Sequence, residues 1–155
     1  MDQRKRTLHL SAEVRELDRE LRRLTARACP ALVGIFGAGS DTAGALLLAA
    51  GDNPERLRSE AAFAKLTGVS PVQASSGKTT RHRLNRGGDR HANAALHRIV
   101  LVSLRSRHPP TIDYVARRSA EGKSKRQIIR CLKRYVAREV YRTLTDVQAD
   151  LSSAA

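Results

Sequence analysis

The sequence predicts a mainly α-helical fold: a helix-hairpin-helix-like domain with an N-terminal amphipathic helix of coiled-coil type and a long basic loop. Of the 155 residues, 41% are hydrophobic but only 3% are aromatic, and tryptophan is absent. A core that must be built from Leu, Ala, Val and Ile suits packed helices. Apolar residues recur at helical spacing, and capping residues precede several apolar segments. We expect a coiled-coil-like arm over residues 1–28, a single domain over 29–145 and a flexible tail over 146–155.

The arm has the spacing of a coiled-coil seam. Its apolar positions are separated alternately by four and three residues, and they are Leu10, Val14, Leu17, Leu21, Leu24 and Ala28. Charged residues lie between them, and Pro30 is expected to end the helix. Fewer than three heptads make a weak coiled coil, so two interpretations stay open. The helix packs on its own domain, or it joins a second copy of the chain in a homo-oligomer.

The segment after the arm, "ALVGIFGAGSDTAGALLLAAGD", predicts a turn followed by a helix. Ser40 is the expected N-cap, and the helix is expected to run to Gly51. The pattern around Gly37 and Gly39 resembles a helix-hairpin-helix, in which the glycine turn brings backbone N–H groups close to a nucleic-acid phosphate. The alternative is a glycine turn that serves steric purposes alone.

Four more helices are expected, each preceded by a residue that can cap its first turn: Ser59, Asp89, Thr111 and Ser124. The first is predicted to stop at Gly68, and the second to be broken at His108 by the two prolines that follow. The last is predicted over residues 125–144, with one apolar face and a strongly basic remainder.

The net charge of +14 and the pI near 11.1 indicate a polyanionic partner. DNA or another nucleic acid is the leading interpretation, and an anionic membrane surface is the second. Cys29 and Cys131 lie far apart without a CxxC pair, so we predict no metal site and no disulfide. Because no apolar run approaches the ~18 residues of a membrane span and no signal peptide is recognisable, we expect a cytoplasmic protein.

Residues 69–88 have no apolar period and hold most of the residues suited to chemistry. The cations from this loop to the next helix are Lys78, Arg81, Arg83, Arg86 and Arg90. Such groups can hold a phosphodiester and neutralise the charge that builds up in phosphoryl transfer. Ser76 stands beside Gly77, where the backbone can approach a substrate closely, and a nucleophilic serine needs a base or positive charge nearby. The alternative is a solvated basic loop.

The stretch "SSGKTT" at residues 75–80 also looks like the end of a phosphate-binding P-loop. That motif needs a glycine five positions before Gly77, where this sequence has Val72. The flanks, with Pro71 before and Gly87-Gly88 after, are not an apolar strand and a helix. The sequence therefore excludes a P-loop.

The order of motifs is more specific than any one of them. From Gly37 onward the chain reads "GAGSDTAG", then "LTGVSP", "SSG", the basic loop and "GGDRHAN". Together with the arm and the closing helix, roughly residues 8–145 resemble the C-terminal transposase domain of the insertion-sequence "one-ten" group. These are recombinases with a RuvC-like DEDD N-terminal domain, guided by a structured bridge RNA.

The resemblance implies DNA strand exchange through a transient phosphoserine, and by motif position the nucleophile is Ser76. It implies DNA as a partner, with a structured guide RNA possible, and a nucleoid-associated place in the cytoplasm. The Mg²⁺ of the family belongs to the acidic domain that precedes the arm, which this chain is expected to lack, so no cofactor is expected here. A chain without that domain is expected to be inactive alone. The alternatives are a non-catalytic nucleic-acid-binding fragment or regulator and a ribosome-type RNA-binding protein.

Overall fold

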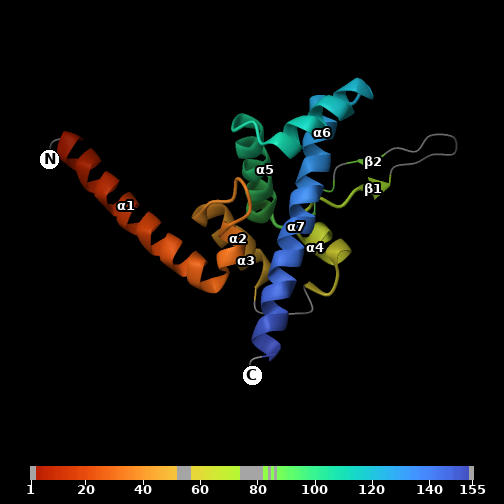
Figure 1. Cartoon of the computed structure of the whole chain (residues 1–155). Coiled ribbons are helices and arrows are strands. Elements are labelled where there is room, and N and C mark those ends of the chain that lie inside the picture. The colour runs from red at the N-terminus through yellow and green to blue at the C-terminus, as the bar shows by residue number, and fades with distance from the viewer. Residues whose placement is uncertain (1–2, 52–56, 74–81, 84, 86, 154–155) are drawn as a thin grey trace.

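The computed structural model describes residues 3–51, 57–73, 82–83, 85 and 87–153 (Figure 1). Over these ranges it confirms the mainly α-helical class. The elements in chain order are α1 (Gln3–Ala28), α2 (Pro30–Val33), α3 (Ser40–Ala50), α4 (Glu60–Leu66), β1 (Val72–Gln73), β2 (His82–Arg83), α5 (Arg90–Arg105), α6 (Pro109–Ala120) and α7 (Lys125–Ser153). The two short strands are antiparallel, with Val72 opposite Arg83 and Gln73 opposite His82.

Three parts of the molecule stand out in Figure 1. Helix α1 leaves the body at one side, and the β1–β2 hairpin leaves it at the other side. Between them α7 runs the length of the body, with α5, α6 and α4 beside it. The sequence predicted only a long basic loop where the hairpin lies, because its four strand residues show no apolar alternation.

The core is mainly aliphatic, as the composition predicted. Its largest fully buried side chains are Phe63, Leu32, Leu46, Leu96, Ile99, Val100 and Val140. Ala43, Ala92 and Ala95 are completely buried, which lets helices α3 and α5 approach closely. Phe63 of α4 packs near Tyr141 of α7, with ring centroids 6.2 Å apart. Burial of these apolar side chains on several helices stabilises one packed body.

Three of the predicted caps are confirmed. Ser59 Oγ accepts a hydrogen bond from the N–H of Ala62 at 3.1 Å, and Asp89 Oδ1 accepts one from the N–H of Ala92 at 2.7 Å. At the start of α7, Gln127 Oε1 accepts from the N–H of Ser124 at 2.8 Å. Each contact satisfies a backbone donor near the start of its helix that has no intrahelical partner.

Two predicted caps and one helix end are wrong. Ser40 is the first residue of α3 rather than its cap, and Gly39 takes the cap position. Thr111 is the third residue of α6, because Pro109 can begin the helix: its fixed φ suits the first position and its missing N–H is not needed there. Helix α7 continues past Leu144 to Ser153, through most of the predicted tail.

Much of the seam of α1 is exposed. Leu10, Val14, Leu17 and Leu24 are 50%, 57%, 70% and 48% exposed, whereas Thr25 near the end of the helix is buried. Only the C-terminal part of α1 packs against its own domain, near α2 and α3. The heptad-spaced residues before it have no apolar cover in the described chain, and pairing with a second copy stays a prediction.

Tyr114 of α6 is expected to titrate later than an ordinary tyrosine. Burial, and next a hydrogen bond with Cys131 of α7, raise the pKa of Tyr114 from 10.0 to about 12. The unfolded chain therefore releases this proton first, so Tyr114 contributes stability below pH 10 that is lost between about pH 10 and 12. An absorbance titration of phenolate should show a transition near pH 12 that Tyr114→Phe removes. Survival of that transition in the variant would contradict the assignment.

Candidate functional site at the base of the hairpin

The base of the hairpin is a contact between two backbone segments. One segment is the end of α4 at Gly68, and the other is Gly88, immediately before the cap of α5. Gly88 has φ +111°, and a Cβ added there would lie 2.7 Å from the N of Gly68 and 2.8 Å from the O of Leu66. The N–H of Asp89 donates to the O of Leu66 at 2.7 Å. No side chain larger than hydrogen fits between the segments at Gly88.

Side chains from α5 and α7 extend this contact. Asn93 Nδ2 donates to the O of Thr67 at 2.7 Å, and Lys133 Nζ donates to Asn93 Oδ1 at 2.6 Å. Thr67 is fully buried, and its hydroxyl donates to the O of Phe63 at 2.9 Å. The end of α4, the first turn of α5 and the middle of α7 are therefore joined under the hairpin. We call Gly68, Gly88, Asn93 and Lys133 the hairpin clamp.

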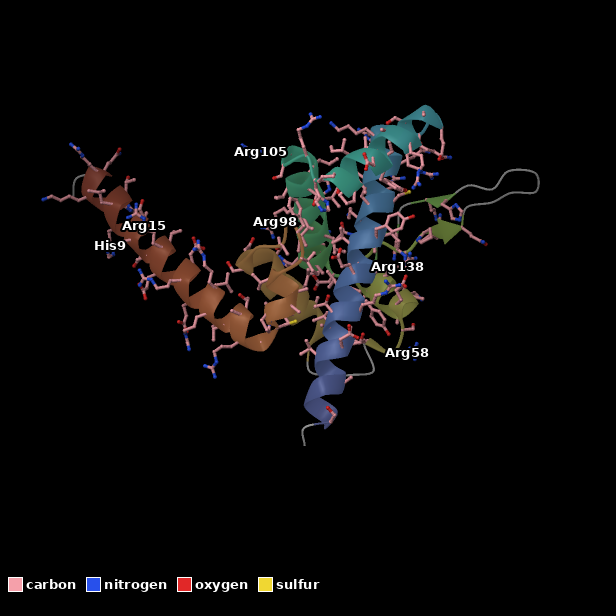
Figure 2. All side chains as sticks on the ribbon, viewed as in Figure 1. His9, Arg15, Arg58, Arg98, Arg105 and Arg138 are labelled. Carbon is pink, nitrogen blue, oxygen red and sulfur yellow. The ribbon has the colours of Figure 1, made fainter. Side chains whose placement is uncertain are left out.

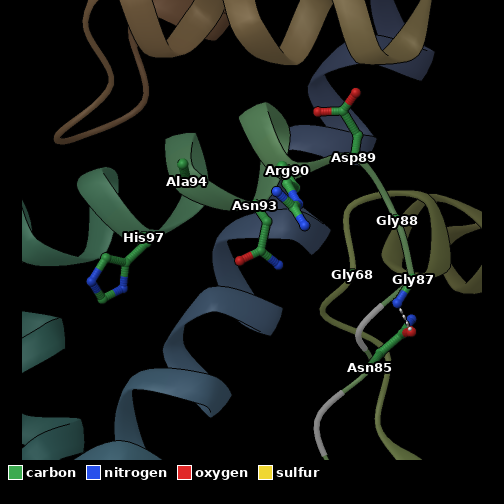
Figure 3. A pocket seen from close by; sticks show the side chains of 9 residues that line it. All are labelled: Gly68, Asn85, Gly87, Gly88, Asp89, Arg90, Asn93, Ala94 and His97. Carbon is green, nitrogen blue, oxygen red and sulfur yellow. Dashed lines mark hydrogen bonds between the residues drawn. The ribbon is translucent and has the colours of Figure 1, made fainter.

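A pocket of about 280 Å³ opens beside the clamp (Figure 3). It is lined by Gly68, Asn85, Gly87, Gly88, Asp89, Arg90, Asn93, Ala94 and His97. Arg90, Asn93 and His97 follow one another at helical spacing, so they lie on one face of α5. The Asp89 carboxylate is engaged with the N–H of Ala92, and Asn85 Oδ1 accepts from the N–H of Gly87 at 2.9 Å. The pocket wall thus presents a guanidinium, an amide and an imidazole.

The electrostatics of the pocket favour an anion. Lys133 is half-buried beside it. Burial lowers the pKa of Lys133, and the positive charge of Arg130 lowers it in the same direction. Basic side chains are spread widely over the rest of the surface, as Arg15, Arg58, Arg105 and Arg138 show in Figure 2. The pocket differs from the rest of the surface because its cations lie beside a glycine turn, where the backbone carries no side chains.

The predicted site residues are only partly described. Arg83 is exposed on β2, and Arg90 is the first residue of α5, where it lines the pocket. The other predicted residues of this loop lie outside the described residues: Ser76, Lys78, Arg81 and Arg86. The chain order places Ser76 in the segment 74–81 that connects β1 to β2. The clamp therefore holds both ends of the part of the chain that contains the predicted nucleophile.

The two predicted glycines lie elsewhere, in the turn between α2 and α3. Gly37 has φ +84° and packs against α5, because a Cβ there would lie 2.9 Å from the O of Ile99. The N–H of Gly39 donates to Thr42 Oγ1 at 2.8 Å, within the cap of α3. Helix α2 has four residues, a single turn. A helix-hairpin-helix and a phosphate contact at these glycines stay predictions.

Sequence reasoning missed three residues of the site: Asn93, His97 and Lys133. Asn93 belongs to the quoted "GGDRHAN" motif and follows the cap at Asp89 by one helical turn, so a local signal existed. His97 follows Asn93 by another turn, on the face that begins with Arg90. No local pattern indicates Lys133, because its partner Asn93 is 40 residues away along the chain.

Neither a metal cluster nor a membrane span is found in the described part of the chain. No group of three or more His, Cys, Asp or Glu lies close enough there to hold a metal ion. No described helix combines the length and the apolar character that crossing a membrane requires. The oxygen donors that Mg²⁺ prefers are thus not assembled among these residues.

Comparison with models of protein families identifies a family. The family model described as "Transposase IS116/IS110/IS902 family" matches residues 29–116. The matched region begins immediately after α1 and includes the hairpin, the clamp residues Gly68, Gly88 and Asn93, and most of α6. A search of curated proteins finds no match.

Proposed function

Because the chain belongs to the transposase IS116/IS110/IS902 family, we propose that it binds DNA and takes part in strand exchange, with Ser76 as the nucleophile. The family ties the chain to transposition in general. We propose three things beyond the family: the serine nucleophile, the contacts to DNA and the binding of a guide RNA. The observation that carries it is the hairpin, whose connecting segment contains Ser76 and whose two ends are held by the hairpin clamp.

The chemistry proposed for Ser76 is a transfer of one phosphoryl group in two steps. The serine oxygen loses its proton to a base and bonds to phosphorus, while the bond from phosphorus to one deoxyribose oxygen breaks and that oxygen gains a proton. A sugar hydroxyl of another strand then attacks the phosphoserine and releases Ser76. One ester bond replaces another at each step, so the phosphodiester energy is kept for rejoining.

The cations around this segment support the proposal. Arg83 lies on β2 and Arg90 lines the pocket at the hairpin base, and the same stretch of sequence contains Lys78, Arg81 and Arg86. Guanidinium groups bind phosphate oxygens in a bidentate way and can stabilise charge that develops in the transition state. We assign these five residues to phosphate contacts of the DNA.

The proposal includes partners that the family resemblance implies. A structured guide RNA would bind together with DNA, and the exposed seam of α1 would pair two copies of the chain. We assign the family's Mg²⁺ to its acidic domain rather than to the residues described here. With a DNA partner, we expect a cytoplasmic, nucleoid-associated protein.

Binding to DNA is expected to depend steeply on salt, and Arg90 is expected to contribute. In a titration of labelled duplex DNA, each phosphate contact adds about −0.9 to the slope of log affinity against log salt. Arg90→Ala should therefore reduce that slope by about one, whereas the exposed Arg58 is the matched control and Arg58→Ala should leave it unchanged. DNA affinity that stays constant between low and high salt would remove the DNA-binding part of the proposal.

A further inference from the structure

Helix α7 carries exposed cations that neither the core nor the hairpin clamp engages, and Arg126 and Arg130 are among them. Arg134 and Arg138 on the same helix pair with Glu60 at 2.8 and 3.1 Å and hold α4 in place. Arg126 and Arg130 are exposed, and no carboxylate in the described chain pairs with either. Their charge is therefore free to meet a partner.

These two arginines align with Lys133 of the hairpin clamp. The three residues are spaced four and three apart, so at about 100° per residue they lie within an arc of about 60° on α7. At a rise of about 1.5 Å per residue, the row is about 10 Å long. It begins in the first turn of α7 and ends at the pocket, because Lys133 Nζ bonds to Asn93 in the pocket wall. We call Arg126, Arg130 and Lys133 the α7 track.

The positive charges of the α7 track repel one another and lie near other positive charges of the isolated chain. Helix α7 has no acidic residue in its first turn but has Lys125 and Arg126 there, at the end of the helix where the macrodipole is itself positive. Farther along, Arg130 lies close enough to Lys133 to disfavour its charged form. An anion with regularly repeated charges would neutralise all three, and a nucleic-acid backbone has this property.

We propose that the α7 track binds consecutive backbone phosphates of a nucleic-acid strand and leads that strand to the pocket at the hairpin base. The proposal rests on the proposed function, since DNA is the nucleic acid assigned there. It adds a second contact surface, on an element far from the hairpin in sequence. Contacts to phosphates carry no sequence information, so the track positions the strand without reading its bases.

The test measures the salt dependence of DNA binding by full-length variants. Arg130→Ala is compared with Arg142→Ala, an exposed arginine of the same helix about 180° from Lys133 around the axis. The double variant Arg126→Ala/Arg130→Ala extends the series. We expect the slope of log affinity against log salt to fall by about one for Arg130→Ala and by about two for the double variant. Arg142→Ala should keep the slope of the unmodified chain.

Each of the other results would contradict either the α7 track or the proposed function. An unchanged slope in the double variant, or an equal change in Arg142→Ala, removes the α7 track and leaves DNA binding intact. A loss that differs between two duplexes of unrelated sequence means that the arginines read bases, which contradicts phosphate binding. If the unmodified chain binds no DNA, the proposed function and the track both fail. Circular dichroism melting of each variant confirms that the exposed substitutions leave the fold unchanged.

Discussion

Ser76→Ala is expected to abolish the covalent protein–DNA adduct, while Ser75→Ala retains it. The expected loss is complete, because alanine has no oxygen to bond to phosphorus and a neighbouring serine would have to reach a different position. The measurement is a denaturing gel with a nicked suicide substrate, which prevents rejoining and traps the phosphoserine. The family's acidic Mg²⁺-binding domain is supplied as a separate polypeptide, so that the metal-binding part of the family is present in the assay.

The pair of serine variants separates catalysis from binding. Both variants should bind DNA with the affinity and salt slope of the unmodified chain, since neither removes a cation. An adduct that survives in Ser76→Ala but disappears in Ser75→Ala would move the nucleophile to Ser75. If no adduct forms with any variant while binding persists, the chain is a nucleic-acid-binding module, and the catalytic assignment is wrong for it.

Gly88→Ala is expected to destabilise the fold by about 2–6 kcal/mol. A side chain at φ +111° costs about 1–3 kcal/mol in backbone strain. The added Cβ would also lie 2.7 to 2.9 Å from backbone atoms of Leu66 and Gly68, which cannot move without opening the hairpin clamp. Overpacking of this kind costs about 1–3 kcal/mol more. A loss of this size is a large share of the 5–15 kcal/mol that stabilises a typical domain.

Gly122→Ala is the matched control for this prediction. Gly122 also has a positive φ, +75°, but nothing lies within 4 Å of an added Cβ. It should therefore show only the backbone term, about 1–2 kcal/mol. The entropy that alanine removes from the unfolded chain is the same in both variants and cancels in the comparison. Urea denaturation measures both, and equal losses would show that the contact at Gly88 is not tight.

The elements that the sequence predicted best are those with local signals. Ser59, Asp89 and Ser124 each accept a hydrogen bond from the N–H three residues later, so their roles can be predicted from a few neighbouring residues. The mainly aliphatic core could be predicted from the composition, because few aromatic residues are present to fill it. The sequence predicted too early an end for helix α7, because the residues after Leu144 are mostly polar. The apolar face of the helix nevertheless continues: Leu144 is buried, and Val147 packs against the core.

The candidate site could be predicted only in part, because its contacts join distant segments. The basic residues from Lys78 to Arg90 are visible in the sequence. The hairpin is not, since Val72-Gln73 and His82-Arg83 pair through backbone hydrogen bonds that any residue can make. The bond from Lys133 to Asn93 and the contact of Gly88 with Gly68 need the tertiary fold, which brings together residues 40 and 20 positions apart.

Mapping of the residue that is linked to DNA identifies the nucleophile. The adduct trapped on the suicide substrate is digested with a protease and a nuclease, and the peptide that carries the remaining nucleotide is sequenced by mass spectrometry. We expect a phosphodiester link at Ser76, in the segment between β1 and β2. A nucleotide attached to any other residue, on the hairpin or elsewhere in the fold, would contradict it.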